Sequence, residues 1–117
     1  MKANELRELS KRLSTRRYIT VPVHIDGAVY EFRLRNLSGL EWQQCIEACR
    51  DPIDKTLLGP EFGPMIVAWS IVDDDNQPIF ASEEGVAEVS CWDGAILTEL
   101  FKAASEHSVP QKKETTP

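Results

Sequence analysis

The chain has 117 residues, of which 42% are hydrophobic and 27% are charged, a composition typical of one soluble globular domain. Its longest apolar run is far shorter than the ~20 residues of a membrane span, and its charged N-terminus does not resemble a signal peptide. We therefore expect no membrane partner. The odd count of three cysteines, without a tight spacing framework, predicts reduced thiols in a cytosolic protein.

The net charge of −6 is distributed unevenly along the chain. Residues 1–17 contain six basic and two acidic residues, a net charge of +4. The rest of the chain contains seven basic and seventeen acidic residues, a net charge of −10. Because an acidic domain repels phosphates, nucleic acid is an unexpected partner for the main domain. The basic arm leaves three partners open: an acidic protein, the acidic part of a second copy, or nucleic acid.

The basic arm, residues 1–17, has the pattern of a short helix. Leu6, Leu9 and Leu13 share one helical stripe within residues 4–17. Three leucines make a narrow apolar face, so this helix is expected to be marginal or to depend on a partner. A partly ordered arm is the first interpretation, and the alternatives are a helix that docks on a partner and an arm that contacts nucleic acid.

The strongest local prediction is a β-hairpin over residues 18–37. Asp26-Gly27 is a two-residue type I′ turn signal, and this turn places eight apolar side chains of the two strands on one face. That face consists of Ile19, Val21, Val23, Ile25, Ala28, Tyr30, Phe32 and Leu34. The opposite face is mostly polar, so a slip of one residue would invert the two faces. Pro22 has no N–H to donate to a ladder, which predicts an edge position for its strand.

Residues 38–50 are predicted to form a helix. Ser38 and Glu41 fit the capping box Ser-x-x-Glu, and Leu37 and Trp42 fit the hydrophobic staple that flanks it. The residues expected to form its buried stripe are Trp42, Cys45, Ile46 and Cys49. A loop rich in proline and glycine is expected to follow this helix.

An apolar segment, residues 65–72, stops at an acidic turn, residues 73–77. Only Ser70 interrupts the segment, so the segment must be buried in the fold or against a partner. It is predicted to form a helix that runs from about Pro64 to the end of the segment. The extended residues 78–80 are expected to pack back on the domain.

The C-terminal part is predicted to contain one further helix. Ser82 caps a short turn, and Ser90 is predicted to start the last helix, with Asp93 in its first turn. The core stripe of this helix consists of Ile96, Leu97, Leu100, Phe101 and Ala104. Residues 18–108 are expected to form a single α+β domain, a hairpin packed on a small bundle of three to four helices. Residues 109–117 are expected to be a disordered tail.

Patterns that carry catalysis or metal binding are weak in this chain. An EF-hand loop counted from Asp73 requires glycine at its sixth position, where Pro78 stands. Cys45 and Cys49 share a helix face but lack two further ligands nearby in sequence, which favours small buried core residues over a zinc site. Neither histidine lies beside a nucleophile, and no nucleotide-binding or hydrolase motif is present. We therefore expect no catalytic residue, no cofactor and no metal.

Two motifs within this order of elements resemble a known family. One is the helix start Leu37–Glu41 after a hairpin, and the other is the run from Ile66 to Phe80, Ile-Val-Ala-Trp-Ser-Ile-Val-Asp-Asp-Asp-Asn-Gln-Pro-Ile-Phe. Together they resemble the tail assembly chaperones of long-tailed bacteriophages over about residues 18–106. The chain departs from the pattern in its turn, where Asp75-Asn76-Gln77 stands in place of a glycine that relatives often have.

The resemblance implies an assembly factor in the host bacterial cytoplasm. Such a protein binds the tape measure protein, keeps the helices of that protein soluble, helps recruit tail-tube (major tail) subunits, and leaves before the virion is complete. A client groove is expected between the helix at residues 38–50 and the apolar helix that follows it. The residues expected to bind the partner are Trp42, Ile46, Met65 and Trp69. Self-association is left open.

Two other function classes stay open at this point. One is a structural subunit of the tail or neck that is retained in the virion, and mass spectrometry of purified particles separates it from a chaperone. The other is a small regulatory binding module whose basic arm contacts nucleic acid, and a binding assay at several salt concentrations tests it.

Overall fold

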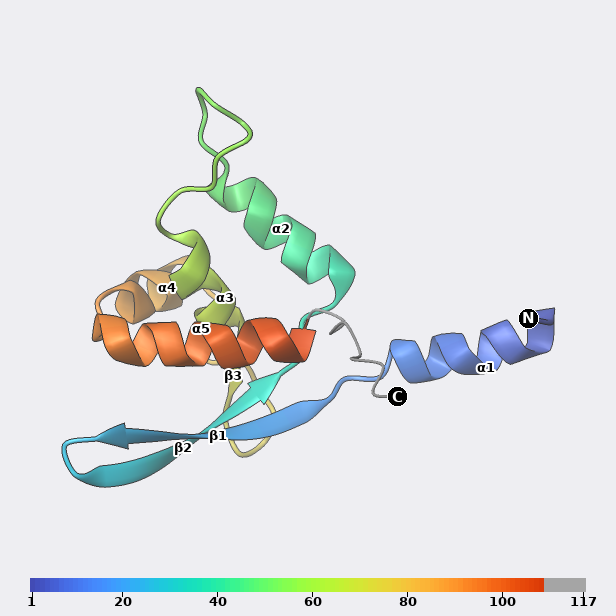
Figure 1. Cartoon of the computed structure of the whole chain (residues 1–117), viewed down its shortest axis with the longest axis horizontal. Coiled ribbons are helices and arrows are strands. Elements are labelled where there is room, and N and C mark those ends of the chain that lie inside the picture. The colour runs from blue at the N-terminus through green and yellow to red at the C-terminus, as the bar shows by residue number, and fades with distance from the viewer. Residues whose placement is uncertain (109–117) are drawn as a thin grey trace, which may run out of the picture.

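The computed structural model describes residues 1–108, and the tail predicted at residues 109–117 lies outside them. Over the described residues the chain forms five helices and one three-stranded antiparallel sheet, which confirms the α+β class with an N-terminal hairpin. The elements in chain order are α1 Ala3–Leu13, β1 Tyr18–Ile25, β2 Ala28–Arg35, α2 Gly39–Cys49, α3 Phe62–Ser70, β3 Ile71–Val72, α4 Glu83–Ser90 and α5 Gly94–Ser108. Helices α2 to α5 gather on one side of the sheet, while α1 projects away from the body (Figure 1).

β1 and β2 form the predicted hairpin in the predicted register. Ile25 pairs with Ala28 across the turn, and the pairing continues without interruption to the far end of both strands. The turn residues Asp26 and Gly27 have φ angles of +51° and +81°, the left-handed conformation that a type I′ turn requires. The strand order β1-β2-β3 places Pro22 on an edge strand, as predicted.

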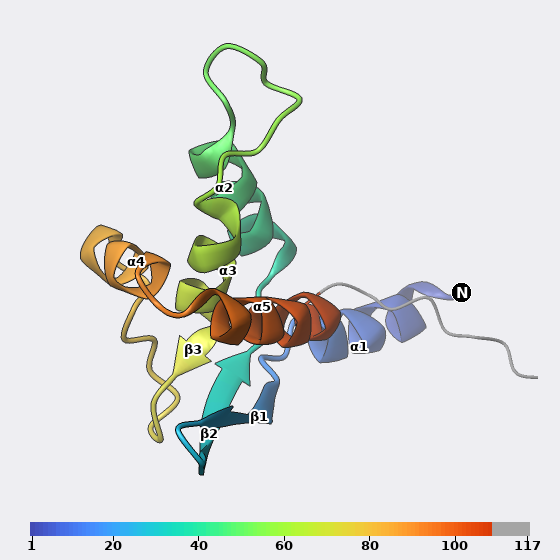
Figure 2. The same cartoon turned by 60° about the vertical axis from the view of Figure 1, so that its left-hand side comes forward.

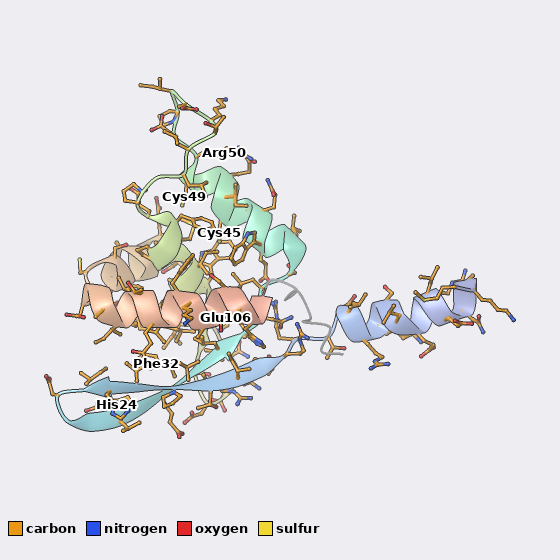
Figure 3. The ribbon with its side chains drawn as sticks, viewed as in Figure 1. His24, Phe32, Cys45, Cys49, Arg50 and Glu106 are labelled. Atoms are coloured by element: carbon orange, nitrogen blue, oxygen red, sulfur yellow. The ribbon has the colours of Figure 1, made fainter. Side chains whose placement is uncertain are left out.

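The apolar face of the hairpin is covered unevenly on its two strands. Val23 of β1 is fully buried, whereas Tyr30, its partner on β2, is 53% exposed; Leu34, farther from the turn on β2, is fully buried. Helix α5 lies over the hairpin in both views, and Phe32 lies between the hairpin and α5 (Figures 1, 2 and 3). The predicted stripe of α5 is buried or half-buried at each of its positions: Ile96, Leu97, Leu100, Phe101 and Ala104. The half of β2 next to the turn, residues 28–31, is therefore left exposed.

The helix predicted to reach Val72 ends at Ser70, which corrects the sequence prediction. Ile71 and Val72 form β3 instead and pair with Leu34 and Arg33 of β2. Two β-branched residues favour extended backbone, and the pairing satisfies backbone groups at the otherwise free edge of β2. Hydrophobicity alone could not reveal this strand, because a buried helix and a buried strand have the same apolar composition.

Helix α3 is the centre of the helical layer and packs against α2, α4 and α5. Ile66, Val67 and Ala68 are fully buried, and the Ser70 hydroxyl donates to the carbonyl oxygen of Ile66 at 2.7 Å. Full burial of an Ile or Val side chain contributes about 1.5–3 kcal/mol. The predicted burial of the apolar segment is confirmed, except that Met65 and Trp69 are only half-buried.

Helix α2 begins with the predicted capping box. The Glu41 N–H donates to the Ser38 hydroxyl oxygen at 3.1 Å, and the Ser38 N–H donates to the Glu41 carboxylate at 2.8 Å. Cys45 and Cys49 are buried where α2 faces the other helices (Figure 3). Their prediction as small core residues is confirmed.

The C-terminal third corrects two predictions. Ser82 does act as a cap, but the element it starts is the eight-residue helix α4 and not a short turn. The last helix begins at Gly94 and not at Ser90, which is the last residue of α4. Asp93 is the residue that caps α5, because its carboxylate accepts the N–H of Ala95 at 2.9 Å. Serine and aspartate are both good caps, so local preference alone did not choose between them.

Candidate partner-binding grooves

An apolar groove opens between α3, α4 and the C-terminal end of α2, and it is termed here the α3–α4 groove. Its volume is about 390 Å³, within the range of binding pockets in proteins. Met65 and Trp69 line it from α3, and Val86 and Ala87 line it from α4. The sequence pattern did not predict this wall of the groove, because it indicated only a short turn after Ser82 where the structure has helix α4.

The local structure of α3 explains why Met65 and Trp69 share the groove. Residues four apart lie on the same helix face, so both side chains point the same way. The Met65 sulfur lies 3.8 Å from the Cys49 sulfur, which ties the groove to the end of α2. The carbonyl oxygen of Trp69 accepts from Nε of Arg35 at 2.7 Å, which ties the end of α3 to β2. The backbone under the groove is therefore fixed, while the two side chains stay half-exposed to a partner.

The other two predicted partner-binding residues lie elsewhere. Trp42 packs edge-on against Phe62, with ring centroids 5.7 Å apart, and Phe62 packs edge-on against Phe101 at 6.2 Å. Ile46 is half-buried on α2 and does not line the α3–α4 groove. The structure therefore brings Met65 and Trp69 together and separates Trp42 and Ile46 from them. The second wall of the groove comes from α4 in place of the middle of α2.

The rim of the α3–α4 groove is acidic. Glu61 and Glu83 line it and are exposed, and α4 carries two more glutamates and no basic residue. Arg50 lies just beyond the end of α2, but its guanidinium already donates to the Glu47 carboxylate at 2.9 Å and to the Lys55 carbonyl oxygen at 2.8 Å. An apolar floor with a negative rim suits a partner that presents apolar side chains flanked by lysine or arginine.

A second hollow, the sheet pocket, lies between the hairpin, the segment before α4 and the start of α5. It has a volume of about 480 Å³. Trp92 lines it together with Phe80 and Phe32, and its ring centroid lies 5.4 Å from that of Phe80 and 6.1 Å from that of Phe32. Its charged lining residues are of mixed sign, Glu31, Arg33 and Asp93. Sequence reasoning missed this pocket, because its walls come from four separate segments of the chain.

An ion cluster anchors the N-terminal arm beside α2. The Arg16 guanidinium donates to both carboxylate oxygens of Glu41, at 2.7 and 3.2 Å, and Nη1 of Arg35 lies 3.7 Å from the same carboxylate. Burial alone would raise the pKa of Glu41, but the hydrogen bonds from Arg16 and from the Ser38 N–H, with both positive charges, lower it from 4.5 to about 2. Glu41 is therefore charged at every physiological pH.

Within residues 1–108, Cys45 lies in the helical core and the Asp73 carboxylate accepts backbone N–H groups of the acidic turn. No group of three or more histidine, cysteine, aspartate or glutamate side chains in that part of the chain could hold a metal ion. Burial raises the pKa of the Cys45 thiol to about 12, so the nucleophilic thiolate does not form. The Asp73 carboxylate accepts the N–H groups of Asp75 and Gln77, at 2.9 and 3.0 Å, and so closes a turn. None of the helices described is long and apolar enough to cross a membrane.

Comparisons with protein-family models, curated proteins and solved structures find no match to this chain. Its function is therefore inferred from the chemistry of the grooves and from the two motifs at residues 37–41 and 66–80.

Proposed function

We propose that the protein is a tail assembly chaperone of a long-tailed bacteriophage. In this proposal it binds helical segments of the tape measure protein in the host cytoplasm, helps recruit tail-tube subunits, and leaves before the virion is complete. The observation that carries the proposal is the α3–α4 groove, an apolar floor with an acidic rim on an acidic domain. The resemblance of residues 37–41 and 66–80 to the chaperone family supplies the functional class.

The floor of the groove suits a chaperone that holds many client segments in turn. Methionine is flexible and polarizable, so Met65 can adapt to different apolar side chains. Trp69 offers a large rigid surface that loses little conformational entropy on binding. An amphipathic helix presents apolar residues at three- and four-residue spacing, the pattern that such a groove accepts.

The charges of the domain favour soluble, reversible complexes. A net charge of −6 favours solubility of the domain and attracts basic client segments. Each apolar client side chain buried in the groove contributes about 1.5–3 kcal/mol, from which the entropy cost of association is subtracted. A small apolar groove therefore suits a reversible complex, which permits release when the tail tube replaces the chaperone around the tape measure protein.

Co-expression tests the client. The tape measure protein of the same phage is produced with and without this chain, and its soluble fraction is measured. We expect the wild-type chain to raise the soluble fraction several-fold and Trp69→Ala to lose most of that gain. Ile79→Ala is the matched control, because Ile79 is a large apolar residue that is 54% exposed and lines the sheet pocket. No gain in solubility with the wild-type chain would reject the proposal.

Mass spectrometry of purified phage particles tests the departure of the protein. A chaperone is expected to be absent from complete virions. Its presence at the copy number of a tail component would assign it instead to the structural subunits of the tail or neck.

A further inference from the structure

Helix α1 is an amphipathic helix that no other element of residues 1–108 buries. None of its residues is buried; Leu6 is 49% and Leu13 is 74% exposed. Both views show α1 projecting from the body on the side away from α4 (Figures 1 and 2). An isolated helix of eleven residues is marginal in water, so a contact on its leucine stripe would stabilise it.

The start of the folded domain holds α1 away from its own α3–α4 groove. The Arg17 N–H donates to the Asn36 side chain at 2.7 Å, and the Asn36 N–H donates back to the Arg17 carbonyl oxygen at 3.0 Å. Arg16 is fixed beside them by its two hydrogen bonds to Glu41. Only residues 14 and 15 separate this anchor from the end of α1, and α1 projects from the anchor away from the body, on the side opposite α4 (Figures 1 and 2).

The arm and the groove match in apolar pattern and in charge. Leu6, Leu9 and Leu13 lie along one side of α1, the spacing of a helix that inserts apolar side chains into a groove. Residues 1–15, which precede the anchor, contain four basic and two acidic residues, a net charge of +2, and the groove is lined by Glu61 and Glu83. Among the described residues, Lys11 of α1 pairs with Glu8, but this ion pair is about three-quarters exposed at both side chains and therefore weak, so it leaves Lys11 available to a new partner.

We propose that α1 of one copy docks in the α3–α4 groove of a second copy. The leucine stripe packs on Met65 and Trp69, and the basic side chains of the arm face Glu61 and Glu83. Because the arm and the groove are different surfaces, the contact is heterologous, and each copy both offers an arm and receives one. This inference goes beyond the proposed function, since it needs no client protein.

Sedimentation velocity over a range of protein concentrations tests the contact. At low salt we expect the weight-average mass of the full chain to rise to about twice the monomer mass or more at several hundred micromolar, as for a small, weak interface. The rise is expected to shrink at high salt, because the rim and arm charges are exposed and screened. A mass that stays at the monomer value across this range overturns the proposal.

Two pairs of substitutions locate the two surfaces. Leu6→Ser with Leu13→Ser removes the stripe of the arm, and Glu61→Lys with Glu83→Lys reverses the rim of the groove. All four side chains are exposed, so the body is expected to stay folded, and each double variant alone is expected to be a monomer. The matched controls, Asn4→Ser on the opposite side of α1 and Glu99→Lys on an exposed part of α5, are expected to associate like the wild type.

Mixing the two double variants distinguishes arm–groove docking from pairing between arms. The stripe variant keeps its groove and the rim variant keeps its arm, so an equimolar mixture is expected to form a one-to-one complex. If arms pair with each other, the rim variant associates by itself, and that result overturns the proposal. The co-expression assay measures the solubility of the tape measure protein, and the mixing assay measures association of this chain with itself. Failure of self-docking and failure of the chaperone proposal are therefore distinguishable, although both contacts use the same groove.

Discussion

The two hollows of this domain are similar in size but differ in how their tryptophans are held. In the sheet pocket, Trp92 packs against two aromatic rings, those of Phe80 and Phe32. In the α3–α4 groove, Trp69 packs against no aromatic ring among the described residues and stands beside flexible Met65. Aromatic pairs contribute about 0.5–1.5 kcal/mol each beyond their buried area. The sheet pocket is therefore part of what stabilises the fold, while the groove leaves its large side chain available to a partner.

The largest expected effect on stability lies in the sheet pocket. Trp92→Ala removes both aromatic contacts and is expected to lower the free energy of unfolding by about 3 kcal/mol. Chemical denaturation followed by circular dichroism measures the change. Tyr30→Ala is the control, because Tyr30 is 53% exposed and should cost less than about 1 kcal/mol. If Trp92→Ala lowered the free energy of unfolding by less than Trp69→Ala, the sheet pocket would not be the more important of the two hollows for stability.

Gly85 of α4 lies against the backbone of Phe80, one of the aromatic residues of the sheet pocket. A Cβ atom on Gly85 would meet the backbone of Phe80, so Gly85→Ala must push the Phe80 segment away from α4. We expect a loss of about 1–3 kcal/mol in the free energy of unfolding, the usual cost of overpacking. Gly94→Ala is the matched helical control, because nothing lies within 4 Å of its added Cβ. Equal effects of the two substitutions would show that Phe80 is not held in place by α4.

The ion cluster beside α2 predicts a pH dependence of stability. The pKa of Glu41 falls from 4.5 to about 2 on folding, so the folded state favours its charged form. The resulting stabilisation, about 1–3 kcal/mol, is fully present above pH 4.5 and is lost as the pH falls towards 2. Glu41→Gln should therefore lower stability at pH 7 and flatten the loss between pH 4.5 and 2. An unchanged slope in the variant would show that the cluster does not control stability in that range.

The smallest expected effect on stability belongs to the groove. Trp69→Ala is expected to cost about 1–2 kcal/mol in the free energy of unfolding, because the side chain is half-exposed and contacts no aromatic ring within residues 1–108. The same substitution should abolish most client binding. A thermal melt and a binding titration on one preparation separate the two effects. If Trp69→Ala lowered the free energy of unfolding by more than Trp92→Ala, Trp69 would be assigned to the core and not to a binding surface.

The parts of the fold that were predictable from sequence are those set by local signals. Asp26-Gly27 fixed the hairpin register, and Ser38 with Glu41 marked the start of α2. Strand β3 was not predictable, because Ile71 and Val72 become extended only through pairing with β2. That pairing is a contact between segments far apart in sequence.

Two of the four predicted partner-binding residues line the α3–α4 groove, and the other two do not, because their positions depend on contacts between separate segments. Met65 and Trp69 could be placed together, since four-residue spacing on one helix determines their common face. Trp42 could not be separated from them, because its position depends on its packing against Phe62, which in turn packs against Phe101. Ser82 followed by Glu83 and Glu84 is the pattern of a capped helix start with an acidic first turn. The acidic rim was not predicted, because this pattern was interpreted as a short turn and not as the start of helix α4.

One NMR titration tests most directly whether the α3–α4 groove is the client site. The chain has two methionines, Met1 and Met65, and three tryptophans, so labelled methyl and indole N–H signals report separately on the groove and the sheet pocket. A peptide with a basic amphipathic helix from the tape measure protein is expected to shift the Met65 methyl and Trp69 indole signals and leave the Trp92 indole unchanged. A shift of Trp92 with Met65 and Trp69 unchanged would contradict the account and move the client to the sheet pocket.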